Sequence, residues 1–493
     1  MAAPNSLMIL TDTDVQRILG NLGRAEIEGM QASLRSALHE YSTGNQDQPC
    51  CHTNQKERMV IENSNGTTSL VIPARSSVGL SLKVVTVAAP QKPSRHSFGA
   101  DESQISDPSP HGSLTLMDTD AHPFAFINAD EVTAFRTALA SSLLIVRRSK
   151  VKAITIFGSG KQAFWHLRLA LLFHGKTIEN VYIHSHHLAH SSKQFFKTFV
   201  GLDHDVKKEE GWHHTKFSML SSDYAEHARL VKAQLRSSDI IICATPSEIP
   251  LFDETILTNP SGRIKGRLII AVGSFKPEMI ELPPALLKQA VKHHGNGRHI
   301  RKRALEGGCV LVDTTKANRQ VGELIQADLG MNHIVEIGEI VMLVEQFAHE
   351  IDGSDDEEIA VDESEPHQSP DGIRKETGMS GMATAISEIT NISRRGSRRG
   401  SKASHDGATT PTESEATSNT SWVSYLSLRK RRHGLNDHHE KKQSKDERDM
   451  TEWLARGNVI YKSVGLGLMD LVVGNELVKL AKDGEYGTII SDF

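Results

Sequence analysis

The sequence predicts an α/β protein with a doubly wound parallel sheet, an accompanying α+β domain and a long disordered insert. From Val151 onward, short and almost uninterrupted apolar runs alternate with helical segments, which is typical of a parallel sheet covered on both faces. The preceding strands alternate apolar and polar residues, as in an antiparallel sheet. Residues 352–448 fit neither pattern. The 493 residues therefore divide into two folded domains and one insert.

The N-terminal domain is expected to span residues 1–149. Thr11 and Asp14 form a capping pattern before a first amphipathic helix, and a second helix follows. The other expected elements are strands at residues 58–63, 67–75, 80–89, 113–119 and 123–129, a polar loop at about 90–110 and a helix at 130–148. A turn at Asn65-Gly66 separates the first two strands, so we predict an antiparallel meander.

The second domain is expected to span residues 150–345. Its buried strands are expected at residues 153–158, 181–185, 239–245, 267–274 and 309–315. Helical segments separate most of these strands, which predicts a doubly wound parallel sheet. After the insert, residues 452–493 contain a strand and a helix that we expect to return to the first domain.

Residues 352–448 are expected to form a disordered, low-complexity insert. They contain an acidic run and a basic run, with few apolar clusters to offset the entropy of ordering. We expect this insert to be dispensable for folding and catalysis, because loop-closure entropy grows slowly with length. Ser397 and Ser401 follow paired arginines, as in sites of basophilic kinases, and the basic run 428–433 could serve nuclear import or bind an acidic partner. A passive insertion is the alternative.

The overall composition excludes several classes of partner. The formal net charge is -5, so the chain has no global cationic field to hold nucleic acid or an anionic membrane. No run approaches the roughly 18 apolar residues of a membrane span. The four cysteines form no C-x-x-C pair, which favours a reducing compartment. We therefore expect a cytoplasmic protein without nucleic-acid or membrane partners.

A glycine-rich turn after the strand at 153–158 predicts dinucleotide binding. Its residues are Gly158, Ser159, Gly160, Lys161, Gln162 and Ala163. The first glycine permits the tight turn, the second lets the backbone approach a pyrophosphate, and the alanine allows close packing of helix on strand. The following helix supplies free N–H groups and a positive dipole.

The end of the next strand favours NADP over NAD as the cofactor. An acidic residue there would accept from the ribose 2′-hydroxyl of NAD and repel a 2′-phosphate. The sequence has no acid between His184 and His187, so we expect Ser185 and His186 to contact the cofactor. The histidine run lacks nearby carboxylate or cysteine ligands, so no metal site is predicted.

Two cations lie where apolar residues are expected, and a third, which taken alone is more typical of a surface residue, opens a strand. Alternation in the strand at 80–89 places Lys83 on a largely apolar face, where a lysine needs an anion or a shifted pKa unless it reaches water at an edge. Helical spacing places Arg136 beside Val132 and Leu139, so its partner is either an internal carboxylate or a bound substrate or cofactor group. Arg58 opens the first strand of the meander.

Motifs that occur together along the chain carry a family resemblance. They are Arg58, the strand pair around Pro73 and Lys83, Thr133–Ala138, Gly158–Ala163, Ala244-Thr245-Pro246, Gly273 with Pro277 and Glu281-Leu282, Val312-Asp313 with Gly322-Glu323, and Lys462–Gly465. With these motifs the sequence resembles the ornithine cyclodeaminase and mu-crystallin family over nearly all of the chain except the insert and the loop at about 90–110.

The resemblance implies a substrate-binding and dimerisation domain followed by a Rossmann-type domain, a homodimer, and a small imino-acid or amino-acid substrate. It implies that Arg58, Lys83 and Arg136 hold the substrate carboxylate, with Lys83 as the proton donor. The further residues expected to bind the cofactor are Thr137, Thr245, Gly273, Ser463, Val464 and Gly465.

One departure from the family decides among its activities. Cyclodeaminases carry an Asp where this sequence has Phe275, and a phenyl ring can neither accept a proton nor pair with an ammonium group. We therefore expect an NAD(P)H-dependent reductase of the cyclic ketimine or pyrroline carboxylate type. Ornithine cyclodeaminase and a non-catalytic, cofactor-binding regulatory protein are the alternatives.

Overall fold

The computed structural model describes residues 6–44, 55–64, 66–87, 111–185, 190–292, 308–342, 440–491 and 493. Most of the predicted insert, with Ser397 and Ser401, lies outside these residues, as does the expected loop at 90–110. The expectation of disorder up to residue 448 is wrong for its last nine residues. They belong to helix α15 (Glu440–Arg456), whose Trp453 and Leu454 are buried.

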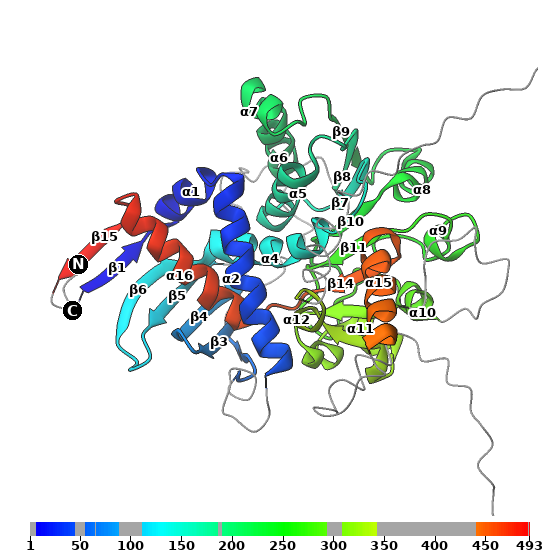
Figure 1. The fold of residues 1–493 in the computed structure, drawn as a ribbon. Coiled ribbons are helices and arrows are strands. Elements are labelled where there is room, and N and C mark those ends of the chain that lie inside the picture. Colours follow the sequence, from blue (N-terminus) through cyan, green and yellow to red (C-terminus); the bar gives the residue numbers. More distant parts are fainter. Residues whose placement is uncertain are drawn as a thin grey trace, which may run out of the picture. The chain divides into compact units, whose positions relative to one another are not determined.

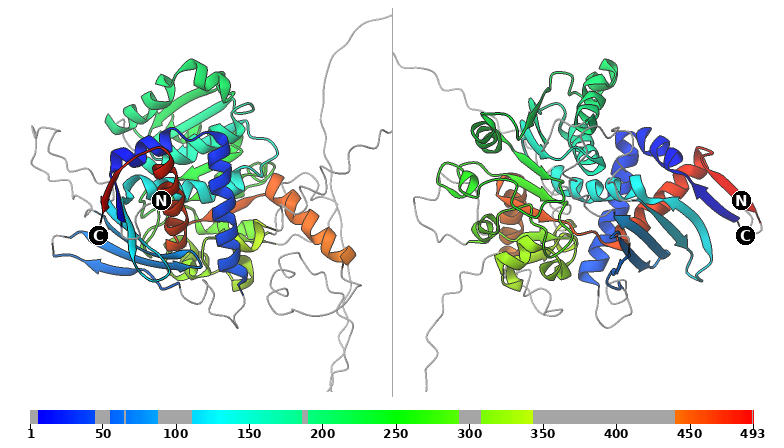
Figure 2. Two further views of the ribbon diagram at one scale, coloured as in Figure 1. Left: turned by 60° about the vertical axis from the view of Figure 1, so that its left-hand side comes forward. Right: turned by 180° about the vertical axis from the view of Figure 1, so that it is seen from behind.

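The first sheet has seven strands among the described residues, in the order β15-β1-β6-β5-β4-β3-β2. They are β1 (Ser6–Leu10), β2 (Met59–Glu62), β3 (Thr68–Ser76), β4 (Gly79–Val87), β5 (His111–Met117), β6 (Pro123–Asn128) and β15 (Thr488–Ser491). Neighbours from β2 to β6 pair antiparallel, which confirms the predicted meander. The sequence analysis missed β1, which runs parallel to β6, and β15, which pairs with β1 (Figure 2).

Helices cover one face of this sheet (Figure 1). The helices of this region are α1 (Asp12–Gly20), α2 (Arg24–Thr43), α4 (Ala129–Ile145) and α16 (Gly467–Asp483). α16 approaches β5 closely, because a Cβ on Gly474 would lie 3.0 Å from Leu114 and 3.1 Å from Leu116. The opposite face carries exposed apolar side chains, including Leu82 and Phe126 at 37% and 42% exposure.

The second sheet has eight strands among the described residues, in the order β13-β12-β14-β11-β10-β7-β8-β9. They are β7 (Ala153–Phe157), β8 (Asn180–Ser185), β9 (Lys216–Ser221), β10 (Ile240–Cys243), β11 (Leu268–Ala271), β12 (Val310–Val312), β13 (Ile334–Glu336) and β14 (Val459–Lys462). Every neighbouring pair is parallel, as predicted. The chain moves outward from β7 to β9 and then crosses back to β10, so the strand order reverses between β7 and β10.

Helices pack against this second sheet. They are α5 (Lys161–His174), α6 (His190–Gly201), α7 (His204–Glu209), α8 (His227–Ser237), α9 (Thr255–Thr258), α10 (Pro284–Val291), α11 (Gly322–Ala327) and α12 (Ile337–Ile340), with short 3-10 turns at Thr315–Arg319 and Met331–His333. Successive strand residues face different apolar clusters. On β10, Ile240 and Ile242 belong to one, whereas Ile241 and Cys243 belong to the other. Two covered faces explain why these strands are apolar throughout.

The return of the chain after the insert differs from the expectation. Strand β14 does not join the first domain, because it pairs with β11 on one side and with β12 on the other in the second sheet. Only α16 and β15 return to the first sheet. Buried Arg148 holds the preceding turn by donating to the carbonyl groups of Leu454 at 2.8 Å and Gly457 at 3.1 Å.

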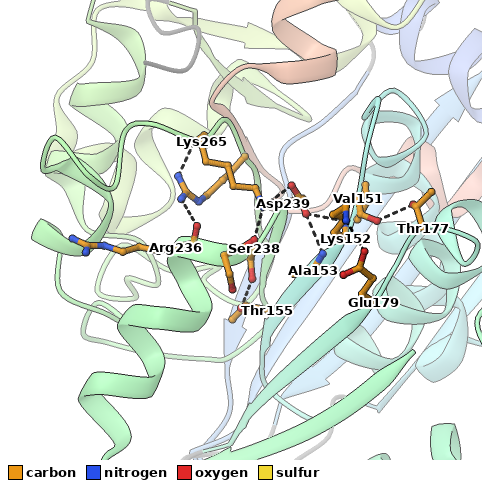
Figure 3. Close-up of polar contacts among 12 residues, drawn as sticks. Val151, Lys152, Ala153, Thr155, Thr177, Glu179, Arg236, Ser238, Asp239 and Lys265 are labelled. Atoms are coloured by element: carbon orange, nitrogen blue, oxygen red, sulfur yellow. Dashed lines mark hydrogen bonds and ion pairs between the residues drawn. The ribbon is translucent and has the colours of Figure 1, made fainter. Parts of the chain in front are cut away.

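A polar network fixes the amino ends of the two central strands (Figure 3). The Asp239 carboxylate, just before β10, accepts from the backbone N–H groups of Lys152 and Ala153 at 2.8 and 3.0 Å. Lys265 Nζ lies 2.7 Å from the same carboxylate. With β7 and β10 held at this edge, the opposite carboxyl edge can offer a rigid crevice at the point of reversal, where ligands bind in such folds.

No helix in the described part of the chain is both long and apolar enough to cross a membrane.

Candidate active site

The glycine-rich turn forms a cradle at the carboxyl ends of β7 and β10. Gly158 has φ +109°, and a Cβ there would lie 2.6 Å from the carbonyl oxygen of Ala244, so only glycine fits. Gly160 opens α5 with no side-chain cap, and a Cβ on it would meet no atom within 4 Å. The turn therefore leaves open space at an uncapped helix N-terminus, which suits a pyrophosphate.

The side chains of the same motif turn toward α4. Lys161 Nζ lies 2.8 Å from Glu131, and Gln162 Nε2 donates to the carbonyl of Thr133 at 3.3 Å. Ala163 is fully buried. The Lys161 ammonium group and the Gln162 Nε2 are therefore engaged with α4, whereas the backbone of the turn is not.

Two buried oxygens beside this cradle have no hydrogen-bond partner among the described residues. They are Gln162 Oε1 and Thr245 Oγ1. Thr245 borders the turn, since its Cγ2 would lie 3.2 Å from a Cβ on Gly158. Unpartnered polar atoms and free space together fit a polar ligand such as a dinucleotide. The Thr137 hydroxyl, by contrast, donates within α4 to the carbonyl of Thr133 at 2.8 Å.

Three serine hydroxyls meet at the end of β8. Ser192 Oγ lies 3.0 Å from Ser159 Oγ and 2.6 Å from Ser185 Oγ. His186 lies outside the described residues. His184 does not act as a surface donor, because it is buried and stacks on Phe157 with ring centroids 4.7 Å apart. Burial lowers its pKa to about 4, so the His184 imidazole is neutral at pH 7.

Two of the predicted cations share one buried carboxylate. Lys83 Nζ lies 2.8 Å from both carboxylate oxygens of Asp470, and Arg136 Nε lies 3.1 Å from Oδ1. All three residues are at most 4% exposed. Lys83 is on the inner face of β4, as its alternation predicted, rather than at an edge. The internal carboxylate expected as one possible partner of Arg136 is therefore present.

Burial controls the protonation of Lys83. Desolvation lowers its pKa from 10.5 to about 8, and the positive charge of Arg136 acts in the same direction. The negative charge of Asp470 opposes both effects. Thr133 Oγ1 lies 3.5 Å from Lys83 Nζ, at the limit of hydrogen bonding. A lysine whose pKa lies near neutrality can donate and regain a proton during a reaction.

Arg58 connects the first sheet to the carboxyl edge of the second. Its Nη2 donates to the carbonyl of Phe275 at 2.5 Å and its Nη1 to the carbonyl of Val464 at 3.4 Å. These carbonyls follow β11 and β14 respectively. Burial lowers the pKa of Arg58, whereas Asp313 raises it. Arg58 and Arg136 thus both reach the loop after β14.

The loop of Ser463, Val464 and Gly465 wraps around Asp313. Ser463 Oγ donates to this carboxylate at 3.0 Å, and the N–H groups of Val464 and Gly465 donate at 3.1 and 2.7 Å. Gly465 has φ +87°, and a Cβ there would lie 2.8 Å from Arg136 Nη2. Close approach of the guanidinium therefore requires glycine.

A second buried carboxylate holds the loops after β10 and β11. Glu281 accepts from the N–H groups of Thr245 at 3.0 Å, Gly273 at 2.7 Å and Ser274 at 3.1 Å. Burial raises the pKa of Glu281 to about 7, although Lys462 lowers it. Gly273 is enclosed, because a Cβ there would lie 2.2 Å from the Thr245 carbonyl oxygen. Thr245 and Gly273 are thus positioned through their backbones.

The positive charge of Lys462 lies between two buried carboxylates, those of Glu281 and Glu323. Its Nζ lies 3.2 Å from Glu323 Oε1 and 3.6 Å from Glu281 Oε2, and donates to Ser274 Oγ at 2.6 Å. The four residues are fully buried or nearly so. This cluster is separate from the pairing of Lys83 with Asp470 and stabilises the loops rather than the proposed proton donor.

The sequence analysis missed Asp470 as a functional residue. Its signal was available, since one acid interrupts the apolar segment of residues 466–473. A buried carboxylate in such a helix needs a cationic partner. In the described part of the chain one group could hold a metal, Asp118, Asp120 and His122, but Asp118 is only partly buried and the other two residues are exposed.

Comparison with known proteins gives distant relatives. No family model matches the chain. An uncharacterized protein of Saccharomyces cerevisiae is 26% identical over 236 residues, which cover 43% of this chain and 58% of that protein. A Delta(1)-pyrroline-2-carboxylate reductase of Bacillus cereus is 26% identical over 232 residues, which cover 46% of this chain and 59% of the reductase. The chain thus spans less than two thirds of the length of these curated relatives.

Solved structures match over nearly the full length. The Delta(1)-pyrroline-2-carboxylate reductase of Thermococcus litoralis, in complex with NADH and L-proline, has a TM-score of 0.55 at 16% identity and covers 98% of this chain and 99% of its own. An archaeal alanine dehydrogenase dimer with bound NAD has a TM-score of 0.55 at 13% identity and covers 99% and 100%. A probable ornithine cyclodeaminase from Bordetella pertussis has a TM-score of 0.52 at 15% identity and covers 98% and 99%.

The chain therefore shares its fold with these pyrroline-2-carboxylate reductase, alanine dehydrogenase and ornithine cyclodeaminase structures. The comparisons agree with the resemblance and confirm the predicted fold class of a Rossmann-type domain beside an α+β domain. The loop after β11 carries Phe275, at the place where the resemblance implies an acid in cyclodeaminases. The backbone carbonyl of Phe275 binds Arg58, and its ring lies 5.9 Å from Lys276 Nζ.

The depressed pKa of Lys83 makes a prediction about stability. Between its folded pKa of about 8 and its ordinary value of 10.5, the unfolded chain binds more protons than the folded chain. The free energy of unfolding of the wild type, relative to Lys83→Met, should therefore rise across this window by roughly 2–4 kcal/mol and stay level below it. Urea denaturation from pH 7 to 10.5 measures this difference. A level difference across the whole range would contradict a buried lysine with a lowered pKa.

Proposed function

We propose that the protein is an NAD(P)H-dependent reductase of a small cyclic imino acid, of the pyrroline carboxylate or cyclic ketimine type. The observation that carries the proposal is the charge balance beside the cofactor cradle. Arg58, Lys83 and Arg136 face two carboxylates, Asp313 and Asp470, which leaves one positive charge in excess. A substrate carboxylate would neutralise this excess in a buried place where an unpaired charge is costly.

The arrangement also assigns roles to the three cations. The guanidinium groups of Arg58 and Arg136 would hold the substrate carboxylate, because both reach the loop of Val464 and Gly465. The bound nicotinamide cofactor would supply the hydride that reduces the carbon of the C=N bond. Lys83 Nζ would then give its proton to the nitrogen, so that the imine gains one hydride and one proton and becomes an amine.

The loop after β11 favours this reaction over cyclodeamination. Removing an amino group from ornithine requires a base or an anion beside that group. Phe275 offers only a ring and a backbone carbonyl, and the carbonyl is already bound by Arg58. A relative of the family is described as a Delta(1)-pyrroline-2-carboxylate reductase, which agrees with a net reduction.

The first prediction of this proposal concerns turnover. The purified protein should reduce Δ1-pyrroline-2-carboxylate with NADPH, and should release no ammonia from ornithine with NAD. Arg136→Ala should lower kcat/KM by about 100-fold or more, because it leaves the substrate carboxylate unpaired in a buried site. Arg75→Ala, on an exposed position of β3, is the matched control. Ammonia release at an ordinary enzymatic rate with no imine reduction would instead establish a cyclodeaminase.

The second prediction concerns the cofactor. We propose a preference for NADPH, because the described end of β8 offers the hydroxyl group of Ser185, close to Ser159 and Ser192, and no carboxylate. NADPH should bind about tenfold more tightly than NADH in a fluorescence titration, a difference of about 1.4 kcal/mol. Ser185→Asp should reverse the preference by accepting from the ribose hydroxyl. Ser218→Asp, on exposed β9, should not. Equal affinity for both cofactors in the wild type would overturn the preference.

The third prediction concerns assembly. We propose a homodimer through the uncovered face of the first sheet, where Leu82 and Phe126 flank Thr115 in register and β2 exposes Met59 and Ile61 at 61% and 43%. A contiguous apolar face suits a second copy of the chain. Leu82→Asp should convert a dimer into a monomer in light scattering, whereas Ile249→Asp, at a still more exposed position on the second domain, should not. A wild-type monomer at micromolar concentration would contradict the interface.

A further inference from the structure

Asp470 occupies a position that the proposed reaction does not explain by itself. It lies in the first turn of α16 and contacts two cations from two other elements, Lys83 on β4 and Arg136 on α4. A carboxyl group in this turn lies at the positive end of the α16 dipole. A single buried carboxylate therefore sets the environment of both groups that are proposed to handle substrate.

The surroundings of Lys83 make Asp470 the dominant electrostatic influence. Ile72 on β3 and Leu114 on β5 pair with Lys83 across the sheet and carry no charge. On the helix side, the charged groups facing it among the described residues are Asp470 and Arg136, and Thr133 adds one hydroxyl. Desolvation and Arg136 both favour the neutral amine, so Asp470 alone opposes them.

The contact with Arg136 is selective for one edge of the guanidinium. Asp470 binds Nε, whereas Nη1 contacts Met469 Sδ at 3.4 Å and Nη2 lies toward Gly465. Two nitrogens are thereby kept out of the ion pair and directed to the loop after β14. An incoming carboxylate could bind them without displacing Asp470.

We infer that Asp470 is a positioning residue that keeps Lys83 protonated and directs the free edge of Arg136 toward the substrate carboxylate. The inference rests on the proposed function for the identity of the substrate. It predicts that removing only the negative charge, in Asp470→Asn, lets the pKa of Lys83 fall further below its wild-type value. The donor would then lose its proton at a lower pH.

The first experiment measures kcat/KM against pH on Δ1-pyrroline-2-carboxylate with NADPH. In Asp470→Asn the alkaline limb should move down by about one pH unit or more, as expected for losing an opposite charge in contact. Asp470→Glu, which keeps the charge, should retain the wild-type limb even where kcat falls. Asp483→Asn, at the exposed end of the same helix, is the control and should leave the profile unchanged. If the alkaline limb of the kcat/KM profile stays at the wild-type pH in Asp470→Asn, the inference is overturned. A purely structural role of Asp470 would lower kcat/KM without shifting the pH of this limb.

The second experiment needs no turnover and separates this inference from the proposed function. The free energy of unfolding is measured against pH in the wild type and in Asp470→Asn, and the value for the matching variant that also carries Lys83→Met is subtracted from each. The pH at which this difference begins to rise is then compared between the two backgrounds. The onset should occur at lower pH in Asp470→Asn. If the wild type reduces no imino acid, the proposed function fails, while this onset still decides the role of Asp470. If Asp470→Asn does not fold, Asp470→Glu decides it: a wild-type onset supports the inference and a lowered onset refutes it.

Discussion

The buried carboxylate of Asp470 between Lys83 and Arg136 is the interaction on which the site depends. It joins β4, α4 and α16. Asp470 lies 387 residues after Lys83 and 334 residues after Arg136 in the sequence. Without a partner, each of these charges would be too costly to bury. The return of α16 to the first sheet therefore completes the ion cluster as well as the apolar core.

The same return places the loop after β14 between the two sheets. Asp313 gathers the N–H groups of Val464 and Gly465, and Arg58 binds the carbonyl of Val464. Glu281 gathers the loops after β10 and β11 in the same manner. Buried carboxylates thus position backbone rather than side chains at the carboxyl edge. Such sites stay rigid while leaving N–H groups and open space for ligands.

Local periodicity was sufficient to find the candidate site, for physical reasons that apply within one element. Alternation along β4 placed Lys83 on the inner face, and helical spacing on α4 placed Arg136 against apolar neighbours; both are buried. The glycine pattern at Gly158 and Gly160 located the cradle, because those turns tolerate few other residues. Spacing within one element did not show that the ring of His184, near the end of β8, turns inward and stacks on Phe157.

The sequence by itself determined the types of most elements, the two sheet classes, and the burial of Lys83 and Arg136, because each follows from spacing over a few residues. Only the tertiary structure decided the pairings that join distant segments. It placed β14 between β11 and β12, added β1 and β15 to the first sheet, and brought Asp470 to Lys83. No local pattern encodes these choices, because strand order and buried ion pairing depend on which remote surfaces remain to be covered once the other elements have packed.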